Sequence, residues 1–284
     1  MLHRERGYLR YDTDDPRALG PAGNLQRDGF VVLRGVFGAG EIAEIKHDVE
    51  RVFDEYPPDI RRPDFGDDFW TDFRYEMLNR SPVVQRLVSD ARLLDVVQPL
   101  LGHDCHVIAN TAWRNPAGAE SAHGGGRWHM DAGPHIPRPP GVAWDDRVPY
   151  PVFAIATHVL LEAMPLESGP TGVIAGSHKS GQVPPRDRLT DVGLEWEGEG
   201  VTPLVADAGD VAMFVSDIWH RRLPTLDGDP GRFFVQIHYG RRDIAQRIRP
   251  TAEVNHLSPD AVERAIESGN GTVVGLHKPF FYDG

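Results

Sequence analysis

Short apolar segments separated by glycine and proline turns fill the chain from about residue 105 to residue 240. These segments cover 105–113, 150–164, 204–215 and 232–239, and turn residues such as Ala208-Gly209-Asp210 interrupt them. Apolar or alternating runs of this length, bounded by turn residues, predict β-strands. Many short strands joined by turns predict an antiparallel sandwich or barrel of the jelly-roll kind.

Helical periodicity dominates the first third of the chain. Apolar residues recur at helical spacing over 41–56 and again over 83–101, and one short apolar strand, within 28–37, precedes both stretches. Ser81-Pro82 has the form of a helix N-cap followed by a proline at the first helical position. We expect one broken or two short helices after it, packed outside the β core.

One domain accounts for this organisation. A length of 284 residues with 40% apolar content can bury a large core. We expect a mainly β domain with flanking helices over 1–284, with a helical N-terminal third over 1–103 and a jelly-roll core over about 104–240. A C-terminal helix begins at Ser258-Pro259, and with an apolar tail it completes the region 241–284.

Charge and cysteine content exclude several classes of protein. The formal net charge of −12 argues against nucleic acid or an anionic membrane as a partner, because both favour clustered positive charge. One cysteine, Cys105, excludes an internal disulfide and a cysteine-rich zinc site, as is typical of a reducing compartment. No apolar stretch resembles a signal peptide or a membrane span, so a cytoplasmic protein is expected. The oligomeric state stays open.

The segment Trp128-His129-Met130-Asp131 is a candidate metal site. On a strand, residues i and i+2 face the same way, so His129 and Asp131 can bind one ion while Met130 packs on the other side. The best third ligand is His220, which follows the apolar run 211–215. Two histidines and one carboxylate with open coordination positions are typical of non-haem Fe(II) oxygenases. Taken alone, so short a triplet is more often structural than metal-binding.

Several blocks together resemble a known family. These blocks are residues 28–33, 128–131, 167–178 and 208–210, together with Trp219-His220 and Arg232. In this order they resemble the phytanoyl-CoA dioxygenase family, a branch of the Fe(II)- and 2-oxoglutarate-dependent oxygenases built on a double-stranded β-helix, also called a cupin-like jelly roll. This resemblance implies Fe(II) as the metal, held by His129, Asp131 and His220 as catalytic centre, with 2-oxoglutarate as cosubstrate and O₂ as oxidant.

The resemblance also assigns cosubstrate contacts. Arg232 is expected to bind the far carboxylate of 2-oxoglutarate, since a guanidinium forms a bidentate pair with a carboxylate. Asn110 occupies a position where several relatives carry an amide that touches the cosubstrate, although a strand asparagine can simply satisfy backbone groups. Relatives often have a serine two residues after the distal histidine. Arg222 stands there, and it either replaces that contact or faces solvent.

Weaker substrate contacts are predicted on the strand of Arg232 and on the loops. Strand alternation from Arg232 favours Phe234, Gln236 and His238, while loop position favours Trp113, His135 and Trp144. Loop aromatics frequently only pack the loop down. His178 and His158 are interpreted as structural, the latter as a satisfied core histidine.

The reaction implied by the family is oxidation of a small-molecule metabolite, with succinate and CO₂ released. Hydroxylation is the default, and desaturation, epoxidation or cyclisation use the same centre. Secondary-metabolite tailoring is favoured by association with an arginine-rich composition. Halogenation is disfavoured, because halogenating relatives lack the carboxylate that Asp131 supplies. The alternatives are a non-oxidative cupin-like isomerase or ligand-binding module, and an oxygenase that acts on protein side chains.

Overall fold

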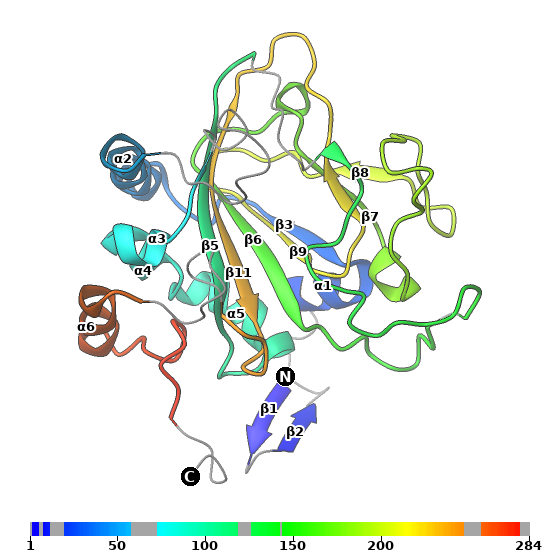
Figure 1. Cartoon of the computed structure of the whole chain (residues 1–284), viewed down its shortest axis with the longest axis horizontal. Helices are drawn as coiled ribbons and strands as arrows, with labels where there is room; N and C mark the ends of the chain where they lie inside the picture. The colour runs from blue at the N-terminus through cyan, green and yellow to red at the C-terminus, as the bar shows by residue number, and fades with distance from the viewer. Residues whose placement is uncertain are drawn as a thin grey trace.

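A six-stranded antiparallel sheet organises the structure (Figure 1). The computed structural model describes residues 2–5, 8–11, 20–57, 73–118, 126–142, 144–246 and 257–278. The strands lie in the order β3 (Phe30–Leu33), β9 (Val211–Val215), β6 (Ala154–Leu160), β11 (Arg232–Gly240), β5 (His106–Asn115) and β4 (Phe73–Arg74). The jelly-roll class predicted from the strand pattern is confirmed by this antiparallel arrangement and by the structural neighbours described below.

A second, smaller sheet faces the large one. It has the order β10 (His220–Arg222), β7 (Thr171–Ile174) and β8 (Val201–Pro203). Two 3₁₀ turns, η5 (Leu166–Ser168) and η6 (Ser177–Ser180), flank β7 as the glycine pattern predicts. A separate hairpin pairs β1 (Leu2–Glu5) with β2 (Tyr8–Tyr11). Of the two strands predicted around the turn Ala208-Gly209-Asp210, the second is β9, but the first is wrong in detail. There β8 ends at Pro203, and the chain pairs next at an isolated bridge between Met164 and Ala206.

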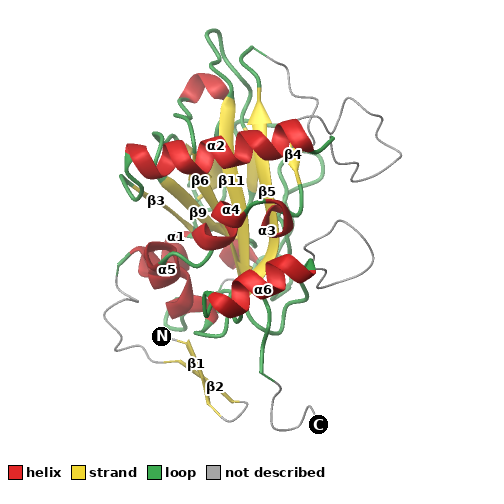
Figure 2. Cartoon of the chain, turned by 90° about the vertical axis from the view of Figure 1, so that its left-hand side faces the viewer, coloured by secondary structure: helices red, strands yellow, loops and turns green. Residues whose placement is uncertain are grey.

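Helices cover the other face of the large sheet (Figure 2). They are α2 (Ala39–Glu55), α3 (Met77–Arg80), α4 (Pro82–Leu87), α5 (Ala91–Leu101) and α6 (Pro259–Glu267), while α1 (Pro21–Asp28) packs on the edge strand β3 and on α5. The predicted N-cap is confirmed, since the Ser81 hydroxyl accepts a hydrogen bond from the Val84 N–H at 2.9 Å. Sequence analysis missed α1, which buries only Ala22 and Leu25 and so presents too few apolar residues to show a period.

Strand alternation gives the large sheet two chemically different faces. Phe233 of β11 meets Phe53 of α2 at 5.9 Å between ring centroids, and the Tyr239 hydroxyl donates to the Val88 carbonyl oxygen. The odd-numbered residues of β11 therefore face the helices. Arg232, Gln236 and the other even-numbered residues of β11 face the small sheet. The site must lie between the two sheets.

A second apolar cluster closes the far side of the small sheet. Trp128, Ile174, Leu194 and Trp219 are all buried there, and Met130 packs against them. The segment 179–200 is mostly polar, yet its Leu194 is 1% exposed. Its polar composition hid the few apolar side chains that attach it to this cluster.

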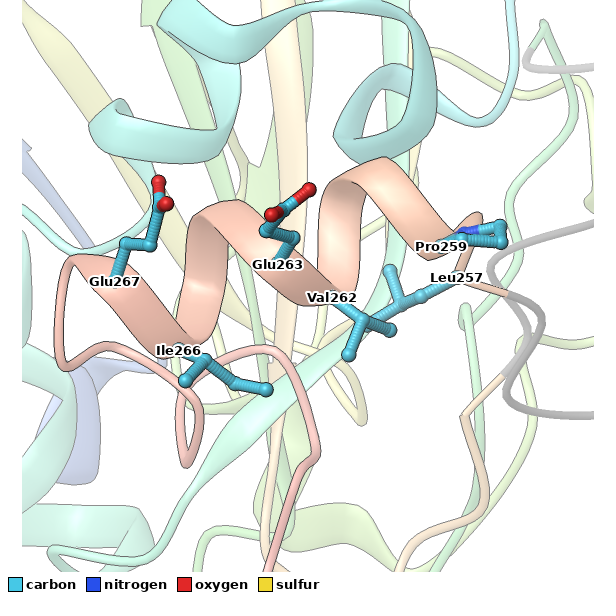
Figure 3. A pocket seen from close by; sticks show the side chains of 6 residues that line it. All are labelled: Leu257, Pro259, Val262, Glu263, Ile266 and Glu267. Atoms are coloured by element: carbon cyan, nitrogen blue, oxygen red, sulfur yellow. The ribbon is translucent and has the colours of Figure 1, made fainter.

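The C-terminal helix α6 packs on the helical layer. It contacts α3 and α4, and Gln85 donates to the carbonyl oxygen of Ala261 at 2.7 Å. A pocket on the outer side of α6 is lined by Leu257, Pro259, Val262, Glu263, Ile266 and Glu267 (Figure 3). Because α6 belongs to the helical layer, this pocket lies on the opposite face of the large sheet from the even-numbered residues of β11. The predicted apolar tail is described only to residue 278.

Within the described ranges, no helix combines the length and the apolar character needed to cross a membrane.

Candidate metal centre

Three side chains of the predicted triad converge between the sheets. His129, Asp131 and His220 each offer one ligand atom, and these atoms lie within 4.8 Å of one another. Asp131 Oδ1 is 3.4 Å from His220 Nε2, and the two imidazole rings have centroids 4.3 Å apart. Residues far apart in the chain are thus brought to one point.

Backbone hydrogen bonds hold the two segments together. His129 N–H donates to the His220 carbonyl oxygen at 2.9 Å, and His220 N–H donates back at 3.0 Å. The predicted strand at 128–131 is nevertheless reduced to one isolated bridge, because Trp128 pairs instead with Leu189 and the chain bends at Asp131. The expected alternation still holds, since Met130 packs into the second apolar cluster.

Main-chain carbonyls orient both imidazoles for metal binding. His129 Nδ1 lies 2.7 Å from the Arg127 carbonyl oxygen, and His220 Nδ1 lies 3.0 Å from that of Ile218. A carbonyl oxygen only accepts, so each Nδ1 carries the proton and each Nε2 keeps its lone pair for a metal. Two such imidazoles and one carboxylate fit Fe(II), whose open positions then remain for other ligands.

Charge interactions keep Asp131 ionised. Burial alone would raise the pKa of Asp131, but the charge and hydrogen bonds of His220 and His238 hold it well below the ordinary value. Burial alone would likewise lower the pKa of His220, and the Asp131 carboxylate instead raises it. The centre therefore holds a negative charge ready for a cation.

A further histidine, His238, lies beside the triad. Its Nε2 lies 3.3 Å from Asp131 Oδ2, on the oxygen that does not face His220. Gln236 Nε2 lies 3.1 Å from the same His238 nitrogen, and Trp113 Nε1 donates to Gln236 Oε1 at 2.7 Å. Three residues predicted as weak substrate contacts thus form one polar chain that reaches the metal centre.

Arg232 is buried on the face of β11 that carries His238. Its side chain is held by Asn115, with Nε and Nη2 at 3.1 and 2.8 Å from Asn115 Oδ1, and Nη1 donates to the Gly169 carbonyl oxygen at 3.3 Å. Asn115 lies directly opposite Arg232 in the β5–β11 register. The role of Asn115 was not predicted, because the predicted strand 105–113 ended two residues before it, whereas β5 continues to Asn115.

Asn110 is not brought to this site. It pairs with Ile237 in the β5–β11 register and therefore faces the helices, where its amide donates to the backbone of Gln236 at 3.1 Å. Asn110 pairs with Ile237, which is five positions from Arg232 along β11. Because this offset is odd, Asn110 faces away from Arg232, and its predicted contact with the cosubstrate is wrong. Arg222 follows His220 by two residues on β10 and so shares its face, partly buried.

The loop residues 132–150 mostly secure the loop itself. The His135 ring bonds to the buried carboxylate of Asp217 and stacks on Phe153 at 4.6 Å, while Tyr150 donates to the same carboxylate at 2.6 Å. Trp144 Nε1 donates to the Val148 carbonyl oxygen at 2.6 Å within the loop. No sequence motif marks Asp217, which ties His135 and Tyr150 at the two ends of this loop to the turn before His220.

The predicted structural role of His178 is confirmed. It is fully buried, and its Nε2 donates to the Gln26 carbonyl oxygen at 3.1 Å.

Comparison with known proteins identifies the family. The phytanoyl-CoA dioxygenase (PhyH) family model matches residues 25–224, and the chain belongs to this family of iron- and 2-oxoglutarate-dependent oxygenases. The ectoine dioxygenase of Sphingopyxis alaskensis is 27% identical over 188 residues, which are 61% of this chain and 54% of that protein. The ectoine dioxygenase of Bordetella bronchiseptica is 27% identical over 224 residues, 69% of this chain and 67% of that protein. The matched region thus spans about half of the Sphingopyxis relative.

Solved structures with the same fold bind this class of cofactor. The epimerase SnoN of nogalamycin biosynthesis, in complex with Fe³⁺, α-ketoglutarate and nogalamycin RO, superposes with a TM-score of 0.62 at 19% identity, covering 87% of this chain and 98% of that one. EctD of S. alaskensis with 2-oxoglutarate and 5-hydroxyectoine has a TM-score of 0.59 at 23% identity, covering 84% and 81%. HygX of Streptomyces hygroscopicus with nickel, 2-oxoglutarate and hygromycin B has a TM-score of 0.58 at 20% identity, covering 84% and 94%.

The predictions of family and enzyme class are confirmed by these matches. The chain is a member of a dioxygenase class whose cofactors are iron, 2-oxoglutarate and O₂, and small molecules are the substrates named for its relatives.

Proposed function

We propose that this protein is an Fe(II)- and 2-oxoglutarate-dependent oxygenase that hydroxylates a small-molecule metabolite and releases succinate and CO₂. One observation carries the proposal: His129, Asp131 and His220 present two carbonyl-oriented imidazoles and a carboxylate to one point between the sheets. Residues 1–284 would then serve as a single oxygenase domain.

Each residue of the site has a proposed task. His129, Asp131 and His220 hold the iron, which together with 2-oxoglutarate and O₂ supplies the oxidising chemistry. Arg232 binds the far carboxylate of 2-oxoglutarate, and Asn115 keeps its guanidinium fork in place by two hydrogen bonds. Arg222 shares the inner face and adds a second positive charge.

Aromatic side chains limit the access of water to this space. Phe214 lies 4.7 Å from the His220 ring, and Phe234 lies 5.6 Å from the guanidinium of Arg232, measured to ring centroids. Excluding water strengthens the charge interactions that hold the cosubstrate. Trp113, Gln236 and His238 are proposed to contact the substrate, because their polar chain reaches Asp131 on the open side of the centre.

Spectroscopy and turnover together test the function. Anaerobic protein loaded with Fe(II) should develop a charge-transfer absorption band when 2-oxoglutarate is added, which a non-oxidative cupin-like isomerase or binding module would not show. A screen of a metabolite panel for substrate-triggered succinate then identifies the substrate class. Absence of the band in wild-type protein that binds Fe(II) would refute the oxygenase.

A further inference from the structure

His158 lies on the inner face of the large sheet, between the positions of Arg232 and His238 on the neighbouring strand. It lies on β6, directly opposite Gln236 of β11 and Ala212 of β9, and its side chain therefore shares the inner face with Gln236. It is 4% exposed. This position is deep within the sheet, yet it belongs to the site and not to the helix-facing core.

The ring of His158 packs against two aromatic side chains. It packs against Phe234 at 4.7 Å and against Phe214 at 5.3 Å between centroids. Neither ring nitrogen has a hydrogen-bond partner among the described residues. The interpretation of His158 as a satisfied core histidine is therefore wrong. Buried polar groups are as a rule hydrogen-bonded, so a molecule bound beside His158 would satisfy a ring nitrogen that the described residues leave without a partner.

His158 is uncharged at neutral pH. Burial lowers its pKa to about 3, and the positive charges of His238, Arg232 and His220 act in the same direction while Asp131 opposes them. A neutral imidazole has one N–H donor and one acceptor nitrogen. It can therefore donate a hydrogen bond to an anionic ligand without adding a buried charge.

The position of His158 matches the path of the cosubstrate. Its pairing partner Gln236 lies four residues from Arg232 and two from His238 along β11. At about 3.3 Å per residue, the backbone separations are roughly 13 Å from Arg232 and roughly 7 Å from His238. A cosubstrate with one end at the metal and its far carboxylate at Arg232 would pass over the side chains of His158 and Phe234, which pack together on the inner face.

We propose that His158 donates a hydrogen bond to an oxygen atom of 2-oxoglutarate bound between the metal centre and Arg232. The proposal rests on the proposed function, and it adds a cosubstrate contact from β6 to the one from β11. An apolar residue at this position would leave this part of the inner face wholly hydrophobic beneath an anionic ligand.

Binding of 2-oxoglutarate to the His158→Phe variant tests the proposal. Phenylalanine fills the same space between Phe214 and Phe234 but cannot donate. Anaerobic titration of Fe(II)-loaded protein, followed by the charge-transfer band, should give a Kd about tenfold or more above wild type, because the lost hydrogen bond is to a charged group. The affinity for the metal alone should stay within about twofold. His158→Gln retains an N–H donor and should recover part of the loss.

Thr157→Val is the matched control. Thr157 is also buried on β6 and its hydroxyl also lacks a partner among the described residues, but it pairs with Ile237 and faces the helices. The valine variant should bind 2-oxoglutarate as wild type does. Equal 2-oxoglutarate affinity in wild type and His158→Phe would overturn the inference, whereas failure of wild-type protein to bind 2-oxoglutarate would instead overturn the proposed function.

A measurement on wild-type protein removes any dependence on the folding of variants. Histidine side chains labelled with ¹⁵N in Zn(II)-loaded protein report each ring N–H directly. Addition of 2-oxoglutarate should shift the His158 signals and slow exchange of its N–H proton with water. Unchanged His158 signals at saturating 2-oxoglutarate would overturn the inference.

Discussion

Replacing Arg232 by alanine should separate cosubstrate binding from metal binding. Arg232 is 5% exposed and lies on the inner face of β11, and its planar guanidinium can form a bidentate pair with a carboxylate. Two charge-assisted hydrogen bonds to a carboxylate are each worth about 1.5–3 kcal/mol, so their loss is about 3 kcal/mol or more. At about 1.4 kcal/mol per factor of ten, the Kd for 2-oxoglutarate should rise roughly a hundredfold or more.

Metal affinity should hardly change in the same variant. Arg232 donates to Asn115 and Gly169, and it is not one of the three residues whose ligand atoms converge at the metal centre. Isothermal titration with Co(II) measures the metal, and the Fe(II) charge-transfer band measures 2-oxoglutarate. Arg232→Lys keeps the charge without the planar fork and should give an intermediate Kd.

Arg221→Ala is the control for loss of a buried arginine. Arg221 is 6% exposed on β10, alternates away from His220, and donates to the Thr190 carbonyl oxygen at 2.8 Å. Both alanine variants should lose about 2 kcal/mol or less of unfolding free energy in urea, but only Arg232→Ala should lose 2-oxoglutarate affinity. Equal weakening of metal and cosubstrate, or of neither, would refute the assignment.

Three further outcomes follow from the structure. Asp131→Ala should lower Co(II) affinity at least tenfold and abolish turnover, because the carboxylate supplies the only negative ligand of the triad; full turnover with normal iron content would contradict this. Burial alone would raise the pKa of Asp210, but the Gly35 and Asp207 N–H groups and Arg34 hold it below its ordinary value. The ionised Asp210 therefore stabilises the fold above about pH 4, and this contribution is lost as the pH falls through the lowered pKa of the folded state. Asp210→Asn should cost about 1–3 kcal/mol of unfolding free energy at pH 7 and progressively less in acid. Urea unfolding at several pH values measures this. Burial, with the charge of Asp104, raises the pKa of Cys105 to about 12. Iodoacetamide should therefore label Cys105 only as the protein unfolds, and rapid labelling of native protein would count against the buried position.

Local sequence patterns predicted most of the secondary structure. The period of 42–53 predicted α2, Ser81-Pro82 predicted the start of α4, and the apolar run from Arg232 predicted β11. These elements carry their own signals, since a helix shows a period near 3.6 and capping residues act within one turn. The helix α1 and the packing of Leu194 were missed, because too few apolar residues mark them.

The chemistry of the candidate centre was also predictable, but its surroundings were not. His129, Asp131 and His220 were chosen by residue type and family order, and the structure brings them together. Asn110 was chosen in the same way and faces the helices, whereas Asn115 faces Arg232. The two asparagines lie on the same strand, five positions apart, and an odd offset along a strand places two side chains on opposite faces.

What the sequence determined by itself was therefore most of the secondary-structure elements, the metal-binding residue types and the family. Which side chains share the space with the metal was decided only by tertiary structure. The register of β5, β6 and β11 puts His158, Gln236 and His238 on the inner face, and packing between Phe214 and Phe234 leaves His158 without a protein partner among the described residues. Strand pairing is a long-range property, since each register joins residues far apart in the chain, and no local pattern records it.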